Sequence, residues 1–381
     1  MRRKKYYIQK IVSPFTISRT KEIVKVNPTK VPQREEAKDI NIYVYDFDTL
    51  VIEERKLSSI AECYPYLNNN KITWINVDGI RKADVEALCN YYNVHPLIQE
   101  DIQSVGQRPK MDEIENILFC ICNMLFYNDE LYKVEQEQIS IVLGKNFVLS
   151  FQEEANKDVF NPIRDKLKIA ASKLRQSGPD YLCYAMLDMI VDNYFVVMEK
   201  LGERIENIEE EIQNSAGSSA LAKINLLRKE MIILKRSIAP VREVINGFIR
   251  TESDLIDEKT LKYFKDVYDH IIQANDLSEN YRDITMNLQD LYLNNVNLRM
   301  NEVMKVMAVV TCLLAPATVI GGIFGMNFDK IPWLHNDRGF YAAVGAMLII
   351  PVWMIVMFRK RVGFNYAKIF TASIAFCKRS S

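Results

Sequence analysis

The stretch VMAVVTCLLAPATVIGGIFGMN, residues 306–327, decides the fold of this chain. The nearest charged residues are Lys305 and Asp329, and none of the 23 residues between them is charged. With about 1.5 Å of rise per residue, a helix of this length crosses a hydrocarbon core of roughly 30 Å. The stretch therefore predicts a membrane-spanning helix at residues 306–327.

Small and weakly polar side chains recur along this predicted helix. Steps of three and four residues place on one face Thr311, Ala315, Thr318, Gly322 and Gly325. Residues of this size allow membrane helices to pack closely, and they also leave room for a pore. The spacing by itself favours close packing, with a pore lining as the alternative.

A second uncharged run, residues 339–358, predicts another membrane helix, joined to the first by the loop 328–338. A loop of 11 residues forces a hairpin, so both outer ends of the pair lie on one side of the membrane. The tail, residues 359–381, opens with three basic residues, and Arg299 and Lys305 precede the first span. By the positive-inside rule we expect both termini in the cytoplasm and the loop outside.

Composition limits the function classes. The 381 residues carry 49 Lys and Arg against 49 Asp and Glu, which argues against nucleic-acid binding through overall positive charge. The basic start, MRRKKYYIQK, leads into no apolar run, so we expect no signal peptide. The seven cysteines lack the spacing of zinc or redox motifs, and no catalytic or nucleotide-binding motif is present. We therefore do not expect an enzyme.

The region before the spans begins with an extended segment, residues 1–40, followed by an α/β domain at 41–160. A helical pattern from Lys82, interrupted at Pro96, lies among the β-like patterns. The last β-like pattern contains a Gly-Lys-Asn turn, which predicts two strands of a hairpin. The patterns are NIYVYDF from Asn41, KITWINV from Lys71, NILFCICNMLFY from Asn116 and ISIVLGKNFVLSF from Ile139.

The next regions are helical. Residues 161–254 predict a cytoplasmic hairpin of two helices, at 179–213 and at 221–250, the second kinked by Pro240. Residues 255–305 predict a stalk helix that continues into the first span. A helix of that length needs partner helices, as in a coiled coil, because an unpaired one is not stable.

A family likeness is carried by residues 301–327, NEVMKVMAVVTCLLAPATVIGGIFGMN. This segment resembles the CorA family of magnesium channels, whose signature is Gly-Met-Asn at the outer end of the first of two C-terminal spans. Here the signature is Gly325-Met326-Asn327. Further segments look like family sequence: HPL from His95, EDI from Glu100, QRPK from Gln107 and KDVYDH from Lys265.

The resemblance implies an α+β membrane protein that assembles as a funnel-shaped homopentamer in the cell membrane. Gly325, Met326 and Asn327 would form the selectivity filter, with Asn327 holding the hydrated ion through its waters. Asp101 and Asp266 match carboxylates that bind a regulatory metal between neighbouring subunits. The implied pore-lining residues are Asp290, Asn301, Met304, Met307, Thr311, Ala315, Thr318 and Gly322.

The implied function is Mg²⁺ uptake driven by the membrane potential and closed by intracellular Mg²⁺, so that Mg²⁺ is both substrate and regulatory ligand. Phe324 stands where the family usually has Tyr. Ala315 stands where a bulky Met often narrows the pore, which leaves the position of the constriction open. We expect His95 and His270 to be packed or to cap helices rather than to bind metal, and we expect His335, in the loop, to be solvated.

Two alternatives stay open at the level of sequence. Related zinc transporters generally share the tripeptide, so Co²⁺, Ni²⁺ or Zn²⁺ is an alternative substrate, and export is an alternative direction. The other alternative is a membrane-anchored scaffold or signalling protein with a coiled-coil stalk. Such a protein would not need the small-residue stripe or Asn327.

Overall fold

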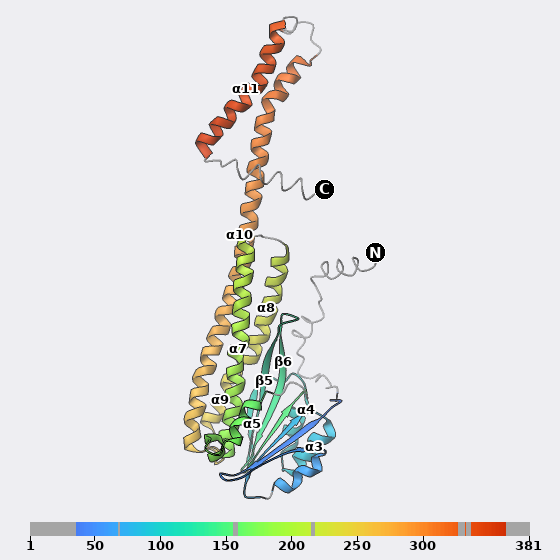
Figure 1. Cartoon of the computed structure of the whole chain (residues 1–381), viewed down its shortest axis with the longest axis vertical. Coiled ribbons are helices and arrows are strands. Elements are labelled where there is room, and N and C mark those ends of the chain that lie inside the picture. Colours follow the sequence, from blue (N-terminus) through green and yellow to red (C-terminus); the bar gives the residue numbers. More distant parts are fainter. Residues whose placement is uncertain are drawn as a thin grey trace. The chain divides into compact units, whose positions relative to one another are not determined.

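The computed structural model describes residues 36–67, 69–154, 159–214, 218–326, 332 and 337–362. These residues form two compact units, one up to Tyr292 and the other from Leu293 onward. Most of the predicted segment 1–40 and loop 328–338, together with the tail from residue 363, lies outside the described residues. Figure 1 shows the elements of each unit.

The first unit contains a mixed sheet of seven strands in the order β2-β1-β3-β7-β6-β5-β4. Only β3 and β7 pair in parallel; the other neighbours are antiparallel. The predicted Gly-Lys-Asn turn does join β6 to β7. The strands are β1 (Asn41–Phe47), β2 (Ile52–Leu57), β3 (Ile72–Asp78), β4 (Lys110–Ile114), β5 (Ile117–Asn128), β6 (Lys133–Leu143) and β7 (Phe147–Gln152).

The sequence pattern did not predict the two edge strands. β2 reads IEERKL and β4 reads KMDEI, and most of their side chains are exposed or half-buried. An edge strand pairs on one side only, and charged residues on it discourage pairing with another chain. These strands therefore lack the apolar alternation by which the inner strands were recognised.

Helices cover both faces of the sheet (Figure 1). On one face, the short helix η1 (Ile60–Tyr66), α3 (Lys82–Tyr91) and α4 (Pro96–Gln103) enclose one hydrophobic core. The other face carries α5 (Asn161–Lys168), α6 (Lys173–Gln176) and the long helix α7 (Pro179–Asn214). This arrangement is a three-layer α/β/α fold.

The core on the α7 face also takes in the helices that follow. These are α8 (Ser218–Ile238), α9 (Val241–Arg250) and the part of α10 (Glu258–Phe324) up to Tyr292. Pro240 breaks the predicted second helix outright, because it stands between α8 and α9. The sheet and the helices thus share one hydrophobic core within the first unit, whereas the predicted domain boundaries at 160 and 254 stay predictions.

The second unit consists of the remainder of α10 and of α11 (Asp337–Val362). Both helices contain an internal proline, Pro316 in α10 and Pro351 in α11. Neither apolar segment is buried within the chain.

Candidate metal site and pore-lining helix

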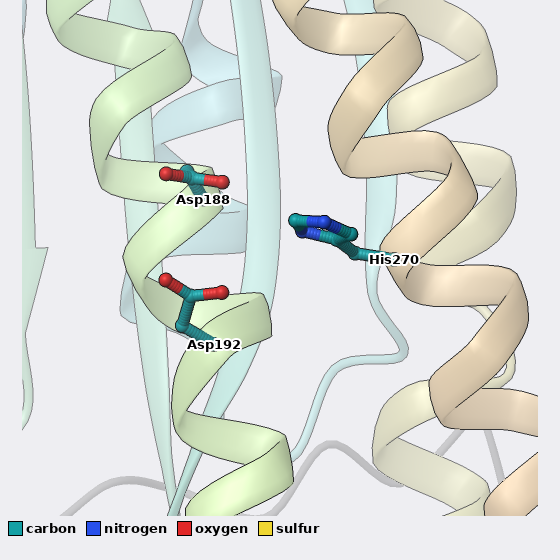
Figure 2. A group of neighbouring side chains, drawn as sticks. All are labelled: Asp188, Asp192 and His270. Carbon is teal, nitrogen blue, oxygen red and sulfur yellow. The ribbon is translucent and has the colours of Figure 1, made fainter.

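A cluster of metal-binding side chains lies between α7 and α10 in the first unit. Asp188 and Asp192 are four residues apart, so they project from the same face of α7. His270 reaches toward them from α10, as Figure 2 shows. One potential ligand atom from each residue lies within 4.8 Å of the other two. Two carboxylates and an imidazole therefore converge on one place.

The electrostatics of the cluster favour a cation. Burial raises the pKa of Asp188, and the neighbouring carboxylate of Asp192 raises it further, whereas His270 lowers it. The Tyr184 hydroxyl donates a hydrogen bond to Asp188 Oδ2 at 3.4 Å. A positive ion between the carboxylates would relieve their repulsion and favour the charged form of Asp188.

His270 supplies an unsatisfied nitrogen. Its Nδ1 is buried, and no group among the residues that the structure describes forms a hydrogen bond with it. A buried polar atom without a partner costs free energy, which a bound ion or its water shell would offset. Carboxylate oxygens suit Mg²⁺, and an added imidazole suits Co²⁺, Ni²⁺ or Zn²⁺. The donor set therefore fits a divalent cation that retains some of its waters.

The two predicted regulatory carboxylates lie at different places in the first unit. Asp266 is exposed on α10, one turn before His270, and its charge helps to raise the pKa of Asp188. Asp101 lies on α4, where its Oδ2 is 2.6 Å from Lys110 Nζ. Asp266 thus adjoins the cluster, whereas a meeting of Asp101 with Asp266 between neighbouring subunits stays a prediction.

Sequence patterns did not single out Asp188, Asp192 or the metal-binding capacity of His270. His95 does cap a helix as expected, because its Nδ1 accepts a hydrogen bond from Leu97 N at 3.2 Å. His270 does not, since its Nδ1 is unpartnered among the described residues. The four-residue spacing of the two aspartates could have indicated a metal site on one helix face. No sequence pattern, however, indicates that a histidine from a helix far along the chain lies beside them.

The apolar part of α10 has two distinct faces. Half-buried residues recur at steps of three and four: Val306, Val309, Leu313, Ala317, Ile320 and Phe324. A Cβ on Gly321, which lies between the half-buried residues and the opposite side of the helix, would be 3.6 Å from Met347 of α11, so the two helices approach each other there. The predicted pore-lining residues, by contrast, are all exposed in the single chain: Asp290, Asn301, Met304, Met307, Thr311, Ala315, Thr318 and Gly322.

The exposed residues that are predicted to line the pore lie opposite the half-buried residues of α10. Thr318 and Ile320 are two residues apart, which is about 200° around a helix, and the same offset relates Gly322 to Phe324. Two threonine hydroxyls on the exposed side bond within their own helix, Thr311 to Met307 O at 2.9 Å and Thr318 to Leu314 O at 3.0 Å. The small residues are exposed in the single chain, and the choice between helix packing and a pore lining stays a prediction.

The predicted filter is described in part. Gly325 and Met326 are exposed just beyond α10, and their backbone N–H groups bond back to Gly321 O and Ile323 O. Asn327 lies outside the described residues.

Comparison with known proteins identifies the family. Residues 69–360 match the family model described as CorA-like Mg²⁺ transporter protein. The chain belongs to this family. The cobalt/magnesium transport protein CorA of Thermotoga maritima is 37% identical over 324 residues, which cover 85% of this chain and 92% of the relative.

Two further matches have lower sequence identity. The zinc transport protein ZntB of Yersinia pseudotuberculosis is 19% identical over 299 residues, covering 76% of this chain and 86% of the relative. The complete structure of the CorA magnesium transporter from Methanocaldococcus jannaschii matches with a TM-score of 0.67 at 22% identity, covering 84% of this chain and 98% of that one. The fold is thus that of a full-length CorA protein, and the family includes transporters of different divalent metals.

Among the residues that the structure describes, three helices are long and apolar enough to cross a membrane: α7, α10 and α11. Half of the apolar window of α7 is buried inside the chain, whereas none of the windows of α10 and α11 is. The hydrophobicity of α7 is therefore explained by the protein core that it joins. The apolar surfaces of α10 and α11 have no such cover in the single chain.

Proposed function

We propose that this CorA-like chain forms a homopentameric channel that carries Mg²⁺ across the cell membrane into the cytoplasm. In this proposal α10 and α11 cross the bilayer, α10 lines the pore and α11 lies outside it. Both termini are cytoplasmic, as the positive charges that flank the two helices favour.

The observation that carries the proposal is the two-faced character of α10. One face is half-buried, and the opposite face exposes small and weakly polar side chains such as Thr311, Ala315 and Thr318. An exposed polar stripe at membrane depth is unfavourable against lipid but favourable along a water-filled lumen. Copies of α10 around an axis would bring these stripes together.

The ion selection follows from the chemistry of the filter. Mg²⁺ dehydrates reluctantly and prefers oxygen ligands, so a ring of Asn327 amide oxygens would hold the hydrated ion through its waters. Amides bind more weakly than carboxylates, which allows the ion to leave. A divalent ion gains about 4.6 kcal/mol per 100 mV of inside-negative potential, which drives uptake without a nucleotide.

The cytoplasmic carboxylates provide the regulation. Mg²⁺ bound at Asp188, Asp192 and His270, with Asp266 beside them, would neutralise mutually repelling charges on α7 and α10. A second contact through Asp101 of a neighbouring subunit would link adjacent subunits of the pentamer and close the pore. When cytoplasmic Mg²⁺ falls, the unscreened carboxylates repel one another and the ring loosens.

A second substrate, Co²⁺, is favoured by one specific observation. The unpartnered Nδ1 of His270 is a ligand type that Co²⁺ uses more readily than Mg²⁺ does. The Thermotoga relative is described as a cobalt/magnesium transport protein. We therefore include Co²⁺ as a regulatory and transported ion.

Mg²⁺ flux into proteoliposomes that hold the purified full chain tests the proposal. Under an inside-negative potential we expect Mg²⁺ uptake, and Asn327→Ala should reduce it about tenfold, equal to about 1.4 kcal/mol in barrier height. Ile320→Val, on the half-buried face of α10, is the matched control and should retain flux. Absence of Mg²⁺ uptake by the wild type would overturn the channel proposal.

A further inference from the structure

Lys110 holds the carboxylate of Asp101 in an ion pair within the chain. Lys110 Nζ lies 2.6 Å from Asp101 Oδ2 and 2.8 Å from Asp112 Oδ2. The side chains of Asp101 and Lys110 are 20% and 37% exposed, so the pair is partly shielded from water. A predicted regulatory carboxylate is thus already occupied by a cation that belongs to the protein.

The fold, and not only the side-chain conformations, fixes the position of this ion pair. Lys110 is the first residue of β4, and Asp101 lies near the end of α4. Gln138 of β6 ties the connecting segment down from both ends, because its Nε2 donates to Asp101 O and its Oε1 accepts from Gln107 N, both at 3.3 Å. The ammonium is therefore held at the carboxylate.

We propose that Lys110 is a tethered competitor of Mg²⁺ at Asp101 and thereby sets the Mg²⁺ concentration at which the chain responds. The inference rests on the proposed regulatory role of Asp101. An ammonium and a divalent cation repel each other, so a metal contact at Asp101 requires Lys110 to withdraw.

Asp112 makes this withdrawal possible at low cost. Lys110 already contacts both carboxylates, so it keeps one partner when the metal takes the other. Asp112 is 37% exposed and lies on the edge strand β4. The ammonium of Lys110 thus contacts Asp101 when no metal is bound there and keeps Asp112 as its partner when a metal is bound. The balance between these two states sets the Mg²⁺ concentration at which the chain responds.

The test is a Mg²⁺ titration of the full chain in lipid nanodiscs at constant ionic strength. Protection from chymotrypsin and the thermal unfolding midpoint report Mg²⁺ binding, and chymotrypsin is unaffected by loss of a lysine. Lys110→Gln should lower the Mg²⁺ concentration for half-maximal protection about fivefold, the effect of removing one partly exposed competing ion pair. Asp112→Asn should raise it, because Lys110 then has only Asp101.

The matched control is Lys223→Gln. Lys223 Nζ also lies 2.6 Å from a carboxylate, Glu211 Oε2, but the pair joins α8 to α7 away from Asp101. This variant has the same change in charge and should leave the midpoint unchanged. In an Asp101→Asn background, Lys110→Gln should have no effect, because the competed ligand is gone.

The outcomes separate the two proposals. If Mg²⁺ gives no protection, or if Asp101→Asn does not weaken it, the regulatory role of Asp101 fails. If Asp101→Asn weakens protection while Lys110→Gln leaves or raises the midpoint, the regulatory role stands and the competitor role of Lys110 is wrong. Should Lys110→Gln not fold, Asp112→Asn still decides, since an unchanged or lower midpoint contradicts the competition.

Discussion

His270 gives the cytoplasmic cluster a ligand that magnesium does not need. Mg²⁺ is satisfied by carboxylates and water, whereas imidazole nitrogen strengthens binding of the later transition metals. The buried Nδ1 has no hydrogen-bond partner among the described residues, so a metal–nitrogen bond would displace nothing. In the proposed site this single residue would favour Co²⁺ over Mg²⁺.

We expect His270→Gln to weaken the response to Co²⁺ far more than the response to Mg²⁺. The Co²⁺ concentration for half-maximal protection from proteolysis should rise about tenfold or more, the usual cost of perturbing a ligand sphere. The Mg²⁺ midpoint should change little. His95→Gln, which alters only the cap of α4, serves as the control, and equal shifts for both metals would contradict a ligand role for His270.

Glu137 is a buried carboxylate with an unusual pKa. It is 3% exposed on β6, and burial raises its pKa to about 7, with the charges of Glu153 and Glu154 adding to the rise. A hydrogen bond from Glu154 N at 2.8 Å acts in the opposite direction without cancelling it. Near neutral pH this residue is therefore partly protonated.

The folded state binds this proton more tightly than the unfolded state does. The contribution of Glu137 to the free energy of unfolding is therefore greatest in acid and falls as the pH rises from about 4.5 to about 7. The loss attributable to Glu137 is about 3 kcal/mol at most. Glu137→Gln should flatten this decline, seen as a smaller drop of the thermal unfolding midpoint between pH 5 and pH 8. Glu135→Gln, on the same strand, is the comparison, and an identical pH profile for wild type and Glu137→Gln would refute the assignment.

At the scale of elements, sequence patterns predicted the features that depend on a single helix or strand. The inner strands, the break at Pro96 and the long α10 follow from local periodicity and length. The edge strands were not predicted, because a strand that pairs on one side only can keep polar side chains and lacks the apolar alternation of an inner strand. The cluster was not predicted because Asp188 and His270 meet only through packing of α7 against α10, and local spacing does not show which side of the apolar part of α10 is half-buried.

The two faces of α10 predict different solvent access in the assembled protein. In a background with Cys312 and Cys377 replaced by alanine, Thr318→Cys should react with a hydrophilic thiol reagent. Ile320→Cys should not, because it lies on the half-buried face of the helix. The five other cysteines are buried and should stay silent. Equal labelling at the two positions would contradict a water-filled lumen on the Thr318 side.

At the scale of the whole molecule, the proposed regulation would act through the core that the first unit shares between sheet and helices. The side chains of α7 that flank the cluster, such as Leu187 and Val191, are fully buried in that core, together with Ile271 beside His270. A charge change at Asp188 therefore acts on packed helices, which shift as units rather than one side chain at a time.

Internal Mg²⁺ should accordingly inhibit flux through the same protein that carries it. Proteoliposomes loaded with increasing Mg²⁺ should take up Co²⁺ more slowly, because the cytoplasmic carboxylates are then neutralised and the ring is closed. Asp188→Asn removes one ligand and should raise the half-inhibiting Mg²⁺ concentration about tenfold. Asp165→Asn, an acidic residue exposed on α5, should leave it unchanged. If Asp188→Asn remains as sensitive to internal Mg²⁺ as the wild type, the cluster on α7 and α10 does not gate the pore, even though the channel itself conducts.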